Sequence, residues 1–147
     1  MQVDIYIELS SRAPKIKKGY FGYVLACEIK GNTRTVEGFG KEEDTTANKM
    51  ALSACVQAMK RMKVPSEIVL HINNAHVRTG HDYIENWKAA GWKNSRGKPV
   101  ANEEMWKELE NLEKPHKVYV SGDLENEYSK WILTEIERRK RGEENER

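Results

Sequence analysis

The chain has 147 residues, and its 25 Lys and Arg side chains against 23 Asp and Glu give a net charge of +2. Hydrophobic residues make up 38% of the sequence, including four Trp and six Tyr, which excludes a disordered chain and suffices for one packed core. No stretch approaches the roughly 20 apolar residues that span a membrane, and Met1 leads into an alternating segment instead of a secretory signal. We therefore expect one cytoplasmic domain with no membrane contact.

Cysteine and histidine form no metal-binding pattern. Cys27 and Cys55 lie far apart in largely apolar runs, so we expect two reduced core thiols and neither a disulfide nor a zinc site. The four histidines share no ligand-like spacing. No metal site follows from these two residue types.

The first part of the chain has the pattern of three antiparallel strands. Residues 3–10 alternate apolar and polar side chains, which is the period of two that marks a strand with one buried face. Residues 20–29 are rich in aromatic and β-branched side chains, and Gly31-Asn32 separates them from a third run at 33–39. The two later runs are therefore expected to form a hairpin.

The remaining residues change between helical and strand periods. Residues 42–63 have a helical pattern with Asp44 or Thr45 as the cap, and Pro65 ends it. A strand, helix, strand crossover then makes the sheet mixed. The later elements are expected to be a strand at 67–72, helices at 75–88 and 102–112, a strand at 118–120 and a helix at 124–141. We expect one domain over 1–138 and a frayed, charged tail over 139–147.

Several segments resemble the ribonuclease H family, and most closely its bacterial type 1 members. Residues 6–10 (YIELS) are similar to the family's Tyr-Thr-Asp-Gly-Ser, and residues 45–52 (TTANKMAL) to its Thr-Thr-Asn-Asn-Arg-Met-Glu-Leu. Residues 83–109 resemble the family's basic handle and the helix after it, and residues 118–127 resemble its last strand and histidine loop. The resemblance implies an α/β ribonuclease H-like fold, with a five-stranded mixed sheet flanked by helices and a basic handle.

The resemblance also implies a catalytic site, and the chain departs from it. Family members cleave the RNA strand of RNA/DNA hybrids with two divalent ions held by four carboxylates, because Mg²⁺ and Mn²⁺ prefer oxygen ligands and repel each other without negative charge around them. Glu8 alone keeps an acid at such a position. The other three positions correspond to Ala51, Asn73 and Lys130, and the loop histidine corresponds to Asp123. We therefore expect no metal cofactor and a loss of two-metal hydrolysis.

Two alternatives stay open. One is an active endoribonuclease that uses magnesium or manganese at a rearranged carboxylate site made of Glu8, Asp123, Glu125 and Glu127. Helix capping and the helix dipole give a simpler and stronger explanation for acids at the start of the last helix. The other alternative is a structural module whose former substrate face docks a protein partner.

Residues 87–98, called the handle below, combine cations with aromatic side chains and contain no acid. Cations contact phosphates and release counterions, while flat aromatic rings pack on sugars or bases. The resemblance implies that this region grips the DNA strand, and it implies further contacts at the start of the first helix. The residues so implied are Thr46, Asn48, Tyr83, Trp87, Lys88, Trp92, Lys93, Arg96 and Lys98.

Each of these contacts has a simpler alternative. Trp87 and Trp92 can pin the handle to a neighbouring helix, the cations can be a solvated surface, and Thr46 can be a helix cap. A second basic cluster after the first strand, which includes Arg12, either extends the track or is ordinary loop. The sequence favours a domain that binds an RNA/DNA hybrid or a duplex without cutting it.

Overall fold

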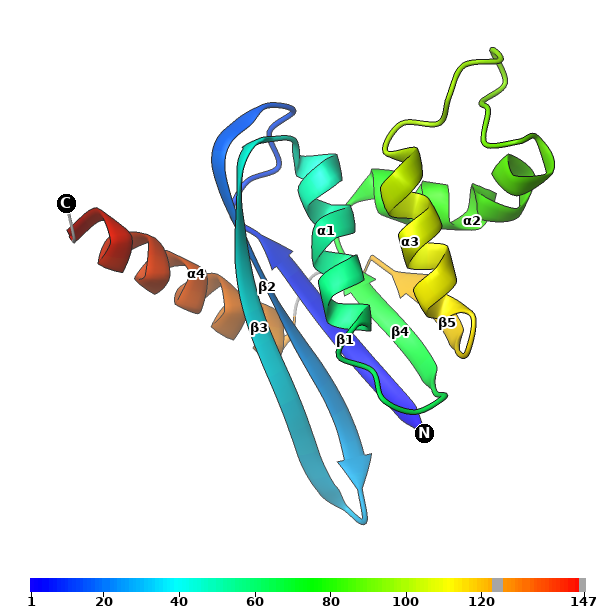
Figure 1. Cartoon of the computed structure of the whole chain (residues 1–147). Helices are drawn as coiled ribbons and strands as arrows, with labels where there is room; N and C mark the ends of the chain where they lie inside the picture. The colour runs from blue at the N-terminus through cyan, green and yellow to red at the C-terminus, as the bar shows by residue number, and fades with distance from the viewer. Residues whose placement is uncertain (123–125, 146–147) are drawn as a thin grey trace.

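The computed structural model of the chain describes residues 1–122 and 126–145. Its strands form one sheet in the order β3-β2-β1-β4-β5, with β1 antiparallel to β2 and parallel to β4 (Figure 1). The predicted mixed five-stranded sheet is confirmed. The elements are β1 (Gln2–Leu9), β2 (Ile16–Ile29), β3 (Asn32–Thr45), α1 (Ala47–Met59), β4 (Glu67–Ile72), α2 (Ala75–Ala89), α3 (Glu103–Glu113), β5 (Lys117–Ser121) and α4 (Glu127–Asn145).

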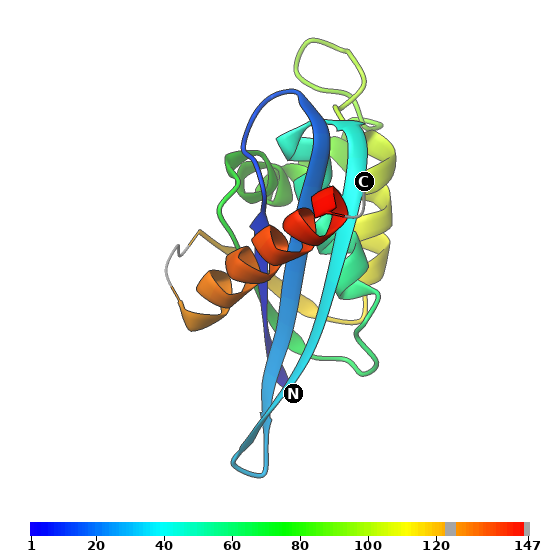
Figure 2. The same ribbon diagram turned by 90° about the vertical axis from the view of Figure 1, so that its left-hand side faces the viewer.

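Helices cover both faces of the sheet. Helices α1, α2 and α3 lie on one face, and α4 crosses the other face over β1 and β2 (Figures 1 and 2). The main core lies between the sheet and α1 and α3, with Trp106 and Leu109 of α3 fully buried. A smaller apolar cluster under α4 contains Ile132 and Ile136. Among the described residues, no helix is long and apolar enough to cross a membrane.

The first helix begins later than the sequence pattern indicated. Residues 40–45 continue β3, because they pair with the start of β2 in a register that places Glu43 opposite Lys18. Helix α1 then begins at Ala47, and its cap is Thr46, whose Oγ1 accepts a hydrogen bond from the Lys49 amide at 3.1 Å. The predicted helix start at residue 42, with Asp44 or Thr45 as cap, is therefore wrong.

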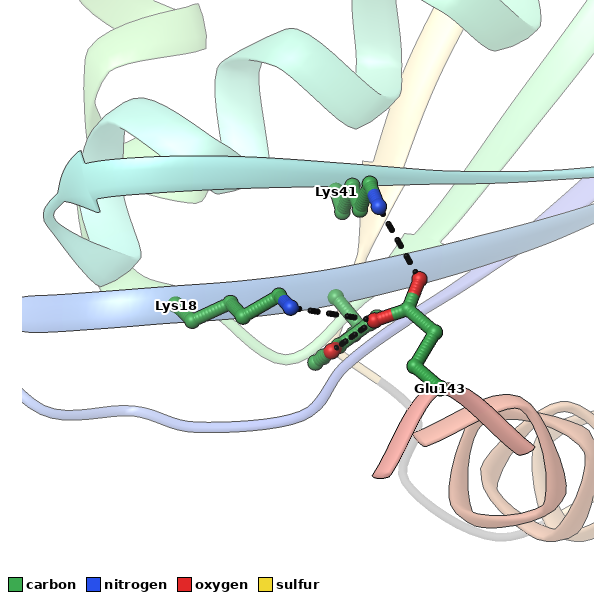
Figure 3. Close-up of polar contacts among 4 residues, drawn as sticks. Lys18, Lys41 and Glu143 are labelled. Atoms are coloured by element: carbon green, nitrogen blue, oxygen red, sulfur yellow. Dashed lines mark hydrogen bonds and ion pairs between the residues drawn. The ribbon is translucent and has the colours of Figure 1, made fainter. Parts of the chain in front are cut away.

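The structure also differs from the expectation of a tail that frays after residue 138. Helix α4 continues to Asn145, and Glu143 in its last turns contacts the sheet (Figure 3). The Glu143 carboxylate lies 3.0 Å from Lys41 Nζ and 3.2 Å from Lys18 Nζ, and it accepts a hydrogen bond from the Tyr20 hydroxyl. These contacts tie the end of α4 to β2 and β3.

Loss of the Glu143 charge is expected to loosen the end of α4. The hydrogen bonds from Tyr20, Lys41 and Lys18 lower the pKa of Glu143 from 4.5 to about 2, so their stabilisation is present above pH 4.5 and is lost as the pH falls towards 2. Glu143→Gln should speed hydrogen exchange in the last turn of α4 severalfold at neutral pH. The matched control, Glu144→Gln, should leave exchange unchanged; equal exchange rates in the two variants would contradict this role.

A buried pair formed by His81 and Glu113 joins α2 to α3 and makes the stability of the fold depend on pH. His81 Nε2 lies 2.7 Å from Glu113 Oε1, and both side chains are at least 85% buried. Burial lowers the pKa of His81, but the hydrogen bond and charge of Glu113, with a smaller effect of Asp82, outweigh it and raise the pKa above 6.5. The charged pair therefore stabilises the fold fully below pH 6.5, and this contribution is lost as the pH rises through the raised pKa.

We expect Glu113→Gln to lower the free energy of unfolding by about 1–2 kcal/mol near pH 6. The deficit should shrink as the pH rises above 7, because the wild-type histidine then loses its charge. Urea unfolding at a series of pH values measures the deficit. Glu104→Gln, at an exposed position of α3, is the control and should change stability by less than about 0.5 kcal/mol. A pH-independent deficit would exclude a charged pair.

Candidate functional site

The carboxyl ends of β1 and β4 form the centre of the site. These strands are parallel neighbours with Ile7 opposite Ile72, so the next residues, Glu8 and Asn73, lie at the same edge of the sheet. A small pocket of about 50 Å³ opens there. This Glu8 pocket is lined by Ile7, Glu8, Leu9, Arg12, Ile72, Asn73 and Leu133.

A guanidinium group takes up part of this pocket. Arg12 follows the end of β1, and its Nη2 and Nη1 lie 2.7 and 2.9 Å from the Asn73 side-chain oxygen in the amide orientation that satisfies both groups. Burial raises the pKa of Glu8, and the charge of Arg12 partly offsets that rise. The sequence places Arg12 in a basic cluster after the first strand and does not predict it as part of this site. The one local indication is its position four residues after Glu8.

The other positions of the family's catalytic set do not restore acidity. Ala51 lies in α1 with no exposed surface and is part of the main core. Lys130 is exposed on α4 and does not line the pocket, whereas Leu133, almost one turn later, does. Asp123 and Glu125 lie outside the described residues, and Glu127 is the first residue of α4.

These donors do not fit a pair of divalent cations. Such ions need several carboxylates between and around them. Among the described residues that line the pocket, Glu8 is the one carboxylate; burial raises its pKa, and it lies beside the cation of Arg12. Within residues 1–122 and 126–145, no three His, Cys, Asp or Glu side chains gather as metal ligands would. The described donors therefore differ from the oxygen-rich set that two divalent ions require.

A short polar network lies next to the pocket. Asn74, directly after Asn73, caps α2 by accepting a hydrogen bond from the Val77 amide at 2.9 Å. Its Nδ2 donates to Asn48 Oδ1 at 3.2 Å, so the start of α1 is joined to the edge of the sheet. Thr46 uses its hydroxyl as the α1 cap, and Asn48 is exposed. Asn48 is thus linked through Asn74 to the end of β4, and the capping alternative holds for Thr46.

The handle consists of the last residues of α2 and the folded loop that follows them. It turns at Gly91 and Trp92, which have positive φ angles, and a bridge between Lys93 and Pro99 closes its loop. The Asn94 side chain accepts hydrogen bonds from the amides of Arg96 and Lys98 at 2.9 and 3.1 Å. The loop therefore holds its cations on an ordered backbone, and Figure 1 shows it extending away from the sheet.

The aromatic residues of this region differ in which of them face the groove beside the handle. Trp87 and Trp92 both pack against the main core, and Lys107 Nζ lies 5.6 Å from the centre of the Trp92 ring. Tyr83 is half exposed and stacks on Trp87 at 6.3 Å. These two residues line a broad groove of about 610 Å³, whereas Trp92 does not. The groove is lined by Thr79, Tyr83, Asn86, Trp87, Ala90, Lys93, Asn94 and Ser95.

The four predicted phosphate-binding cations are also unequal. Lys88 Nζ lies 2.6 Å from Glu110 and 3.7 Å from Glu85, and the hydrogen bond to Glu110 raises the pKa of Lys88. Within the described residues, Lys93, Arg96 and Lys98 form no ion pair and are exposed. The free positive charge of the handle therefore lies in its loop, and that of Lys88 is neutralised by α3.

Three curated relatives match the chain over different lengths. Ribonuclease H of Acetivibrio thermocellus is 39% identical over 117 residues, covering 76% of this chain and 76% of that protein. Ribonuclease H of Legionella pneumophila (strain Corby) is 33% identical over 134 residues, covering 86% and 90%. Ribonuclease H of Brucella anthropi is 42% identical over 91 residues, and this match spans 61% of the chain and 59% of the relative.

Solved structures share the fold at lower identity. LC9-RNase H1, a type 1 RNase H with the type 2 active-site motif, superposes with a TM-score of 0.71 at 21% identity, covering 89% of this chain and 69% of the other. LC11-RNase H1, solved in complex with an RNA/DNA hybrid, gives 0.57 at 16% identity, covering 90% and 94%. The family model for RNase H matches residues 2–122. With the fold and these relatives in agreement, the chain belongs to the RNase H family and resembles its bacterial type 1 members.

Proposed function

We propose that this chain binds RNA/DNA hybrids or duplexes through the handle and the Glu8 pocket and does not hydrolyse them by the two-metal mechanism. The observation that carries this proposal is the donor set of the pocket, where Asn73 and Arg12 lie beside Glu8. A cation and an amide cannot compensate the charge of two divalent ions. Loss of the metal ligands leaves the phosphate-binding surface intact.

The binding half of the proposal rests on the handle. Lys93, Arg96 and Lys98 are free to contact phosphates, and Tyr83 with Trp87 offers an aromatic wall in the groove beside them. The relative LC11-RNase H1 has been solved with an RNA/DNA hybrid, which is the ligand we transfer to this chain. A cytoplasmic location and a hybrid ligand are consistent with each other.

Two measurements on the full chain test the proposal. Labelled RNA/DNA hybrid incubated with magnesium or manganese should stay intact, and calorimetric titration should show no binding of either ion tighter than about 1 mM. Strand cleavage that Glu8→Gln abolishes would overturn the loss of hydrolysis and would favour the rearranged site with Asp123, Glu125 and Glu127.

Salt dependence tests the binding half. Fluorescence anisotropy of the same hybrid should give an affinity that falls linearly with salt on logarithmic axes, by about 0.7–0.9 per phosphate contact. An absence of binding, or an affinity that does not change with salt, would contradict a nucleic-acid interface and would favour a protein-docking module.

A further inference from the structure

Arg12 is an anchored cation at the mouth of the Glu8 pocket. Two of its guanidinium nitrogens point at the Asn73 oxygen, which fixes the plane of the group, and the residue as a whole is exposed. A guanidinium has five N–H donors, and one amide oxygen satisfies only two of them. Donors therefore remain for a second acceptor that approaches from solvent.

The size of the pocket limits that acceptor. About 50 Å³ is far too small for a nucleotide, so the ligand group must stay at the mouth, where Arg12 is exposed. A planar guanidinium pairs best with an anion that offers two oxygens, such as a carboxylate or a phosphodiester. The neighbouring amides of Asn48 and Asn74 add polar groups on the α1 side of the pocket.

Within residues 1–122 and 126–145, Arg12 forms no ion pair with a carboxylate. Its charge acts on Glu8, where it partly offsets the rise in pKa that burial causes. Arg12 therefore remains an exposed cation whose other donors suit a negative ligand.

We propose that Arg12 binds a backbone phosphate of the nucleic acid at the Glu8 pocket, so that a side-chain cation supplies the positive charge there and binding needs no divalent metal. This inference rests on the proposed function, since it assigns one phosphate contact of the same interface. The contact between Arg12 and the phosphate is made by the protein itself and does not pass through a divalent ion.

The test is anisotropy of a labelled RNA/DNA hybrid in the presence of a chelator. Arg12→Ala should weaken binding at least about tenfold and should reduce the salt slope by about 0.7–0.9, the share of one phosphate contact. Arg12→Lys should keep the slope but recover only part of the affinity, because it keeps the charge and loses the two-pronged geometry. Lys17→Ala, which removes an exposed cation at the start of β2, is the matched control and should change affinity by less than about threefold.

Glu8→Gln gives an independent test, because it should raise the affinity for the hybrid whereas Arg12→Ala should lower it. It removes the repelling charge while keeping the size of the side chain, so affinity should rise by about threefold in chelator. Thermal unfolding of each variant checks that the fold is retained. If Arg12→Ala does not fold, the two conservative variants, Arg12→Lys and Glu8→Gln, decide the question.

The outcomes separate the two proposals. Failure of the wild type to bind the hybrid contradicts the proposed function. Binding by the wild type with equal losses in Arg12→Ala and Lys17→Ala leaves the proposed function standing and overturns the role of Arg12. Affinity that requires added magnesium or manganese overturns it as well.

Discussion

Replacing Trp106 with alanine is expected to lower the free energy of unfolding by about 3–5 kcal/mol. The ring has no exposed surface, lies at 5.4 Å from Trp87 in an edge-on arrangement, and packs so closely on Gly80 that a Cβ atom there would come within 2.4 Å of it. Its removal leaves a cavity between α2 and α3, which rigid helices cannot fill. Urea unfolding followed by circular dichroism measures the loss.

Trp131→Ala is the control for this prediction. Trp131 is 38% exposed on α4 and contacts Phe39 at 5.9 Å, so its truncation should cost about 1 kcal/mol. Because Trp87 rests on Trp106, the Trp106→Ala variant should also bind hybrid less tightly under conditions where it is folded. A loss of stability no larger than that of Trp131→Ala would show that α3 is not the support of the handle.

The triple variant Lys93→Ala, Arg96→Ala, Lys98→Ala is expected to bind RNA/DNA hybrid about 10²-fold more weakly than the wild type at moderate salt. The slope of the logarithm of affinity against the logarithm of salt concentration should decrease in size by about two to three times the value for one phosphate contact. The reason is that three free cations are removed from the handle loop. Anisotropy titrations at several salt concentrations measure both quantities.

A triple variant of equal charge is the control. Lys63 and Lys114 are exposed in the loops that precede β4 and β5, and Lys117 is exposed at the first position of β5. Figure 1 places these loops at the end of the sheet opposite the handle. Removal of the three lysines changes the net charge by the same amount and should weaken binding by less than about tenfold. Lys88→Ala should resemble this control, since Glu110 already pairs with Lys88. Equal losses in the two triple variants would mean that net charge, and not the handle, governs binding.

Local sequence patterns were sufficient for most elements of the fold. The apolar run that became β4 was predicted with the bounds that the structure has, because Pro65 and two asparagines punctuate it. The helix α1 was misplaced at its start because residues 40–45 have no strong preference of their own. Their strand conformation comes from pairing with β2, which no local pattern reveals.

Local sequence patterns also do not predict where α4 ends or that Lys88 forms an ion pair. The last turns of α4 have no apolar anchor, and they are held by Glu143, whose partners Lys18 and Lys41 lie more than a hundred positions earlier in the sequence. The sequence predicts a free cation at Lys88, whereas the structure shows it paired with Glu110 of α3. Spacing predicts which residues share an element, whereas charge pairing across elements depends on tertiary packing.

The nearness of Glu8 and Asn73 could be predicted from the order of the strands, whereas the place of Arg12 could not. Glu8 and Asn73 lie at the ends of two strands, and a parallel pair brings such ends together. The contact between Arg12 and Asn73 depends on the path of the loop after β1, and the basic composition of that loop does not predict its path.

That contact has a consequence for any attempt to build a metal site at this position. An aspartate introduced at residue 73 would lie within reach of the Arg12 guanidinium and would pair with it, so its charge would be compensated before a magnesium ion could use it. A variant designed to bind a divalent ion at residue 73 would therefore need to change Arg12 together with Asn73.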